Sequence, residues 1–214
     1  MFRPIDIVQC FHNAFRRDIF EIDERVLKNA NSVGDIGSVF DRLHILGEIL
    51  NYHAKGEEAA VFPAVDKLRP YVSPGYLFDH HELDKMVEAL EEIRKTPEVL
   101  TTARATAVLH SHLRIHLDKE DLYLYPILRE QTTDDEQVAV GKIMSSKIPP
   151  ERFPDFAQWL FNLLSLNDQI MVIKGWMTMM PPQVFLNAKV LIRKNVGNNW
   201  VKIVKLIPQL SEYK

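Results

Sequence analysis

The sequence predicts an all-α protein, an antiparallel up-down four-helix bundle followed by a smaller C-terminal helical region. Three observations support this fold class. Glycine is scarce, with 8 among 214 residues. Long stretches carry apolar residues at three- and four-residue spacing, which is typical of amphipathic helices. The predicted helices are long and their connections short, which favours neighbours packed antiparallel in one bundle.

The bundle is predicted over residues 1–131. Its four helices are expected at about 5–29, 35–68, 75–95 and 98–131. Pro63 and Pro126 lie near the ends of the second and fourth of these helices. Proline lacks the backbone N–H and crowds the preceding turn, so we expect Pro63 to kink or shorten its helix.

The region 132–214 is predicted as a second helical part, packed on the bundle. Its expected helices cover about 134–147, 150–164, 166–179, 181–195 and 198–206. The stretch "TTDDEQ" resembles a helix cap with acids in the first turn. The region has no histidine, and its Met, Trp and Leu pattern is more typical of a helical core than of a cofactor site.

Composition disfavours several classes of function. The formal net charge is −3 and no basic block stands out, so nucleic-acid binding is not expected. The N-terminal stretch and the most apolar tract are both interrupted by polar residues, which argues against a signal peptide and a membrane span. Cys10 is the single cysteine, so we expect a small packing residue and no intramolecular disulfide. These features predict a cytoplasmic protein.

One eleven-residue element occurs twice, as "HAKGEEAAVFP" at 53–63 and "HLDKEDLYLYP" at 116–126. Each copy has His, Glu at +4, a second acid at +5, and an aromatic residue directly before Pro at +10. Positions i and i+4 share one face of a helix. Each copy therefore presents one imidazole and one carboxylate together, an arm suited to a borderline divalent metal.

The first and third helices each add a histidine at a position in line with apolar residues. A lone HxxxE pair is common, and a lone histidine is usually structural. Burying four imidazoles and two carboxylates together without a cation would, however, be costly. The predicted metal ligands are His12, His53, Glu57, His80, His116 and Glu120.

The remaining histidines are expected to be structural or exposed, with His112 the best candidate to support a ligand. They are His44, His81, His110 and His112. Glu58 and Asp121 are expected to face solvent or to support a ligand, and Glu58 could be an extra ligand. Tyr123 and Tyr125 are expected to pack at the rim, although a redox-active tyrosine here would favour an enzyme.

The ligand set indicates two metals. Six ligands are too many for one structural zinc, which normally takes four. Ferritin-type di-iron sites use about four carboxylates and Glu-x-x-His. The set here is richer in nitrogen and poorer in negative charge, which favours reversible binding of O₂, peroxide or NO at an open position.

Four segments resemble the hemerythrin or HHE cation-binding family over about residues 5–131. They are "FHNAFRRDI", "HAKGEEAAVFP", "LFDHHELD" and "HLDKEDLYLYP". They also look like the hemerythrin-like domains of plant iron-sensing ubiquitin ligases, and the C-terminal helices are more loosely similar to the segment that follows such domains. The resemblance implies a hemerythrin-like bundle with two carboxylate-bridged Fe per chain. It also implies roles in O₂ carriage or sensing, NO or peroxide handling, or iron sensing.

The sequence departs from oxygen-carrying hemerythrins, which place two histidines one turn apart on the third helix. Here His80 has Tyr76 one turn before it and Asp84 one turn after it. The fourth helix carries its carboxylate at +4 instead of +5. Water, Tyr76, Asp84 or Glu58 is therefore expected to complete one iron's coordination.

Three functions remain open at this point. The favoured hypothesis is an O₂-, NO- or peroxide-binding protein for sensing, storage or detoxification. The alternatives are a di-iron oxidoreductase with a reductase partner and a regulatory module that exposes a surface to a protein partner when iron or oxygen binds.

Overall fold

The computed structural model describes residues 2–30 and 36–211. It forms two compact units. One is Phe15–Gln131, and the other combines the described residues of Met1–Ala14 and Thr132–Lys214. The long first helix contributes its opening turns to the second unit and its remainder to the first. The sequence-based division at 1–131 and 132–214 stays a prediction.

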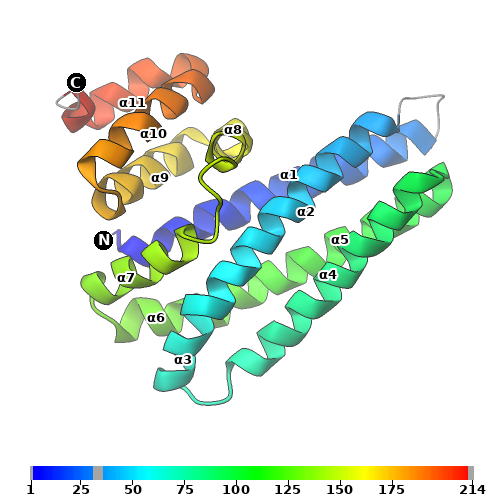
Figure 1. Ribbon diagram of the computed structural model, residues 1–214, viewed down its shortest axis with the longest axis horizontal. Helices are drawn as coiled ribbons and strands as arrows, with labels where there is room; N and C mark the ends of the chain where they lie inside the picture. The colour runs from blue at the N-terminus through cyan, green and yellow to red at the C-terminus, as the bar shows by residue number, and fades with distance from the viewer. Residues whose placement is uncertain (1, 31–35, 212–214) are drawn as a thin grey trace. The chain divides into compact units, whose positions relative to one another are not determined.

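The unit of Phe15–Gln131 is the helical bundle, drawn from blue to green in Figure 1. Its helices are α1 (Ile7–Ala30), α2 (Gly37–Gly56), α3 (Phe62–Leu68), α4 (Ser73–Lys95), α5 (Val99–Lys119) and α6 (Tyr125–Gln131). The helix predicted from 35 begins at Gly37, and residue 35 lies outside the described residues. The prediction of an all-α helical bundle is confirmed, and the described residues contain no β-strand.

The two repeated elements each contain a π-helical turn, at Glu57–Val61 and Glu120–Leu124. In these turns the Phe62 N–H donates to the Glu57 carbonyl, and the Tyr125 N–H donates to the Glu120 carbonyl, five residues back. The turn widens the helix just before each proline, where the ordinary i→i−4 pattern would fail. The helical run therefore continues past Pro63 to Leu68, with a π-helical turn where the sequence had predicted a kink or a shortened helix.

The bundle core is built from apolar faces at helical spacing. Phe15, Ile19, Leu46, Leu113 and Leu117 are among its fully buried side chains. Burial of such side chains stabilises the fold by about 1.5–3 kcal/mol each before conformational entropy is counted. The core thus holds the four long helices in register and fixes which helix faces point inward.

A few polar contacts link the bundle helices outside the apolar core. Buried Asp18 on α1 accepts a 2.5 Å hydrogen bond from Arg42 on α2, and Arg42 also reaches Glu21 at 2.7 Å. Pairing a buried carboxylate in this way offsets the cost of removing it from water. The pair therefore helps to fix α1 against α2.

The second unit joins the start of α1 to the C-terminal helices. These are α7 (Asp134–Ser145), α8 (Phe153–Leu163), α9 (Leu166–Met179), α10 (Pro182–Asn195) and α11 (Trp200–Leu206). Thr133 and Glu136 form the predicted cap at the start of α7. Cys10 is buried here with its Sγ 3.9 Å from Asp168 Oδ1, and burial first, then Asp168, raises the pKa of the thiol to about 12. Its environment is that of a packing residue.

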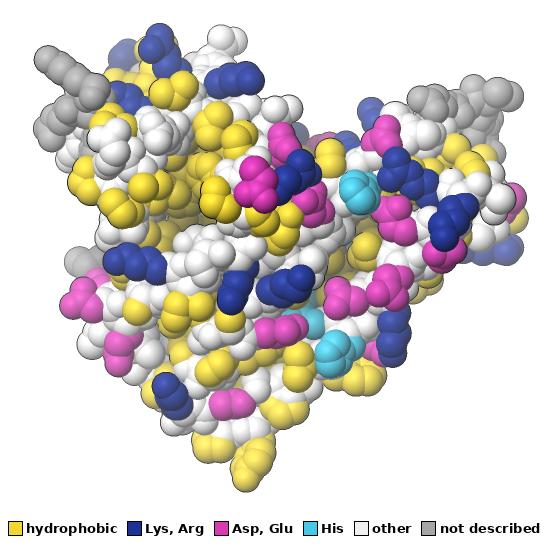
Figure 2. All heavy atoms as spheres, in the orientation of Figure 1, with side chains coloured by type: hydrophobic (Ala, Val, Ile, Leu, Met, Phe, Trp, Pro, Cys, Tyr) yellow, Lys and Arg dark blue, Asp and Glu magenta, His cyan; other side chains and the backbone are white. Residues whose placement is uncertain are grey.

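Acidic and basic side chains intermingle over the bundle helices on the face drawn in Figure 2. Arg94 on α4 and Asp41 on α2, 2.6 Å apart, form an exposed pair. Exposed pairs contribute at most about 1 kcal/mol, so the apolar core carries the stability. Among the described residues, every helix falls short of the length and apolarity that crossing a bilayer requires.

Candidate metal centre

The two repeated arms bring their ligand side chains into the bundle core. Glu57 and Glu120 have no solvent exposure, and His80 and His116 are each 3% exposed. Candidate ligand atoms of these four residues lie within 4.8 Å of one another. Four ionisable groups, three from the two arms and His80 from α4, are therefore concentrated in one water-poor space.

Glu57 lies between two histidines. Its Oε1 is 3.2 Å from His53 Nε2, and its Oε2 is 3.2 Å from His80 Nε2. The two oxygens of one carboxylate thus face two different imidazoles, one from its own helix and one from α4. Glu57 could therefore act as a metal ligand together with either histidine.

Glu120 has a similar place on the second arm. Its Oε1 lies 3.2 Å from His116 Nε2 and 3.9 Å from His80 Nε2. The His80 and His116 rings are in edge contact, with centroids 4.9 Å apart. His80 therefore stands between the two carboxylates.

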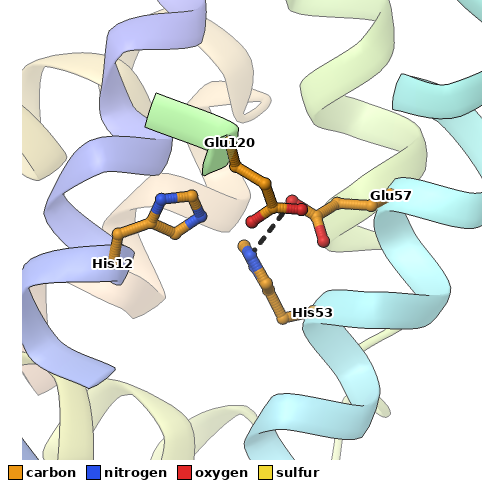
Figure 3. A group of neighbouring side chains, drawn as sticks. All are labelled: His12, His53, Glu57 and Glu120. Atoms are coloured by element: carbon orange, nitrogen blue, oxygen red, sulfur yellow. Dashed lines mark ion pairs between the residues drawn. The ribbon is translucent and has the colours of Figure 1, made fainter. Parts of the chain in front are cut away.

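His12 belongs to a second group of candidate ligands, shown in Figure 3 with His53, Glu57 and Glu120. The ligand atoms of this group also lie within 4.8 Å of one another. His12 is carried by α1, three residues before the bundle unit begins, on a helix that continues unbroken into that unit. All six predicted ligands thus fall into two groups that share Glu57 and Glu120.

The donor atoms fit a metal. Glu57 Oε2 and His80 Nε2 are fully buried, and neither makes a hydrogen bond although they lie 3.2 Å apart. Buried polar atoms without hydrogen bonds are costly. Two ligands at about 2.0–2.2 Å from one first-row cation are spaced in this way, so a shared cation would satisfy both atoms.

Charge is divided unequally over the two carboxylates in the metal-free protein. Burial by itself would raise the pKa of Glu57, but His53 and His80 outweigh it and hold that pKa well below its usual range. Burial and the charge of Glu57 raise the pKa of Glu120 well above its usual range. The surroundings therefore favour the ionised form of Glu57 and the protonated form of Glu120.

The two bundle histidines are also shifted in opposite directions. Burial would lower the pKa of His80, but contacts with Glu57 and Glu58 overcome it and raise that pKa. Burial lowers the pKa of His116 to about 4, with His80 adding to this shift and Glu57 opposing it. The contacts with Glu57 and Glu58 therefore favour the protonated form of His80, whereas burial favours the neutral form of His116.

Carboxylates outside the ligand set orient both imidazoles. His80 Nδ1 lies 3.0 Å from Glu58 Oε1, and His116 Nδ1 lies 3.3 Å from Asp79 Oδ2. Lys119 donates to the same oxygen of Asp79. A carboxylate at Nδ1 holds the ring so that Nε2 presents its lone pair to a metal. Asp79 was missed from the sequence, where it reads as one more acid beside two histidines.

Several residues proposed for support of the site have other places. His112 is exposed, with Nδ1 3.1 Å from the Val108 carbonyl, so it does not support a ligand. Asp84 is exposed, and the Tyr76 hydroxyl donates to the Lys119 carbonyl at 3.3 Å. Asp84 is absent from both candidate groups of ligands.

The remaining histidines make structural or surface contacts, as expected. His44 pairs with Glu91 at 2.9 Å and His110 with Asp23 at 3.0 Å. His81 is exposed. Asp121, at +5 in the second arm, pairs with Arg16 at 2.7 Å.

Tyr125 corrects the expectation that both tyrosines pack at the rim. Tyr123 is 67% exposed, but Tyr125 is only 7% exposed and its hydroxyl donates to Glu57 Oε1 at 2.5 Å. Burial and the charges of Glu57 and Glu120 raise the pKa of Tyr125 well above its usual value. The one signal in the sequence was its position directly before Pro126, which Phe62 shares before Pro63.

A four-helix bundle whose core holds paired histidine–carboxylate arms defines a class of metal-binding helical proteins. Comparison with known families names the class. The family described as the hemerythrin HHE cation binding domain matches residues 3–128. The chain belongs to this family, as the resemblance of the motifs had indicated.

Curated relatives come from Arabidopsis thaliana. A zinc finger protein BRUTUS-like is 23% identical over 194 residues, and zinc finger protein BRUTUS is 25% identical over 172 residues. These matches cover 81% and 77% of the present chain but only 15% and 14% of the relatives. The chain thus spans a small part of the length of these proteins. No solved structure gives a significant match.

Proposed function

We propose that the protein is a non-haem di-iron protein that binds O₂, or NO or peroxide, for sensing, storage or detoxification. The observation that carries the proposal is the Glu57 carboxylate, whose two oxygens face His53 and His80 at 3.2 Å each. A single metal would need only one of these contacts. Two metals bridged by Glu57, with Glu120 as the second shared carboxylate, use the whole set.

Nitrogen-rich ligation favours iron that stays reduced until a small ligand arrives. Four imidazoles are neutral donors, and the two shared carboxylates leave a net positive charge on a ferrous pair. When bound, such a pair supplies the electrons for reversible O₂ binding or for the reduction of peroxide. The positive charge also favours a small anionic or reducible ligand over a bulky organic substrate.

The chain's own residues keep water from the site. Phe15 lies against His53 with ring centroids 5.2 Å apart, and Phe62 stacks on His80 at 5.1 Å. Tyr76 covers His116 at 6.4 Å. Aromatic walls of this kind exclude water, so a bound gas is less readily protonated and released as a reduced product. They also strengthen the electrostatic contacts inside the site. They support binding of a small ligand more than turnover of a large one.

The test is reconstitution with Fe²⁺ under anaerobic conditions, followed by iron analysis and absorption spectra before and after O₂. We expect about two irons per chain and a visible band that appears with O₂ and disappears on purging. His116→Ala should lose iron, whereas His112→Ala, one turn earlier on the same helix, should not. Wild-type protein with one iron or none contradicts the proposal. Sustained peroxide or NO turnover without a reversible band would replace it with the oxidoreductase alternative.

A further inference from the structure

Tyr125 links the two arms by a direct contact. It sits on the second arm, and its hydroxyl donates to Glu57 Oε1 on the first arm, 68 residues away in sequence, at 2.5 Å. The residue at the equivalent place in the first arm is Phe62, which has no hydroxyl and stacks on His80. The repeated element is therefore symmetric in its ligands but not in its aromatic residue.

The contact has the properties of a strong hydrogen bond. Both partners are buried, so water competes little for either group. A phenol donating to an ionised carboxylate forms a charge-assisted bond, which is shorter and stronger than one between neutral groups. The accepting atom, Oε1, is the oxygen that faces His53. The hydroxyl therefore contacts the Glu57 oxygen on the His53 side of the carboxylate.

We propose that Tyr125 is a positioning residue that holds the shared carboxylate of Glu57 in place and withdraws electron density from it. The inference rests on the proposed di-metal function. A carboxylate that accepts a hydrogen bond donates less charge to its metal, and a weaker anionic donor favours the lower oxidation state. Tyr125 thus biases the pair toward the reduced form that captures O₂ and slows its oxidation by air.

The variant Tyr125→Phe tests the proposal because it removes only the hydroxyl. Tyr123→Phe is the matched control, since Tyr123 is two residues away and exposed. We expect Tyr125→Phe to keep its iron and to shift the ferric-to-ferrous equilibrium about tenfold toward ferric. Air oxidation of the reduced protein should be faster to a similar extent, and Tyr123→Phe should match wild type. Equal reduction equilibria for wild type and Tyr125→Phe overturn the proposal.

A fluorinated tyrosine placed only at position 125 gives a second measurement if the Phe variant fails to fold. Fluorine makes the phenol a stronger donor, so the equilibrium should move toward ferrous, opposite to Tyr125→Phe. A purely structural tyrosine gives no such graded response, and its absence contradicts the proposal.

Cobalt separates the two proposals from each other. Wild-type protein that takes up Co²⁺ but not two irons contradicts the di-iron function, and Tyr125→Phe should then still bind Co²⁺, with an altered visible spectrum. An unchanged Co²⁺ spectrum would count against the role of Tyr125 alone. Protein that binds neither ion contradicts both proposals.

Discussion

The two arms carry the same sequence pattern but differ in charge. On the first arm, Glu57 meets His53 and His80 at 3.2 Å and the Tyr125 hydroxyl at 2.5 Å, and its pKa is lowered. On the second arm, Glu120 lies in the field of Glu57 and its pKa is raised. Matched spacing therefore places equivalent ligands, whereas neighbours from other helices decide which of them is ionised.

The arms also differ in what their second acid does. Glu58 turns toward His80 and holds its Nδ1, whereas Asp121 turns toward Arg16 on α1. The first arm thus supports the ligand set directly, and the second arm fastens the bundle. The difference is a consequence of which helix lies beside each arm. Five predictions use this comparison.

The largest effect is expected from removing Glu57, one of the two carboxylates that both groups share. Glu57→Ala should lose both metal ions, because it takes a ligand from each group. His53→Ala and His116→Ala each remove a ligand from one group only and should retain about one ion. Metal analysis after dialysis measures the difference. Two ions in Glu57→Ala would show that the two sites do not depend on this residue.

Removing the bound metal ions with a chelator should lower the thermal stability of the protein. Each ion present at 100 times its dissociation constant stabilises the folded protein by about 2.7 kcal/mol. Losing two ions should lower Tm by about 10–20 °C for a chain of this size. Calorimetry with and without chelator measures the shift. Glu57→Ala should show none, and an equal shift in that variant would place the metal elsewhere.

Amide substitutions at the glutamates of the two arms should have different effects on the unfolding free energy of the metal-free protein. Glu57→Gln removes the buried anion that faces His53 and His80, leaves His80 with Glu58 alone, and should cost about 3–5 kcal/mol. Glu120→Gln replaces a carboxyl whose protonated form is favoured by its surroundings, so the change in unfolding free energy at neutral pH should stay within about 1 kcal/mol. Urea unfolding of chelated protein gives both values. Equal losses would mean that both carboxylates are charged.

The contributions of Glu57 and Glu120 to the unfolding free energy should depend on pH with opposite signs, and each of these two variants should remove one contribution. The stability that Glu57 contributes is present above the ordinary pKa of 4.5 and is lost as the pH falls through its lower folded value. The contribution of Glu120 is present below 4.5 and is lost as the pH rises through its higher folded value. Glu57→Gln should therefore flatten the acid side of the profile, and Glu120→Gln the alkaline side.

The smallest effects are expected from the second acids. Glu58→Gln weakens the support of His80 and should lower metal affinity about tenfold. Asp121→Asn breaks a partly exposed pair with Arg16 and should cost less than about 1 kcal/mol of stability while leaving metal affinity unchanged. Metal titration and urea unfolding of both variants test the contrast. It fails if Asp121→Asn weakens metal binding as much as Glu58→Gln.

Much of the site could be predicted because helical periodicity is local. His53 with Glu57, and His116 with Glu120, are four residues apart and must share a face wherever the helix goes. His80 was predicted to face inward because apolar residues follow it at helical spacing, and it is 3% exposed. Asp79 and Tyr125 could not be found in this way, since each acts on a residue 37 or 68 positions distant.

The sequence by itself determined the helical class, the pairing of each histidine with its glutamate, and the positions of the prolines that accompany the two π turns. These features depend on residues within two turns of one another, where backbone geometry is fixed. Only the tertiary structure decided that the surroundings favour ionised Glu57 and protonated Glu120, and that the buried Tyr125 hydroxyl contacts the glutamate of the first arm. Electrostatic energies depend on distances between helices and on exclusion of water, and neither is written in a local pattern.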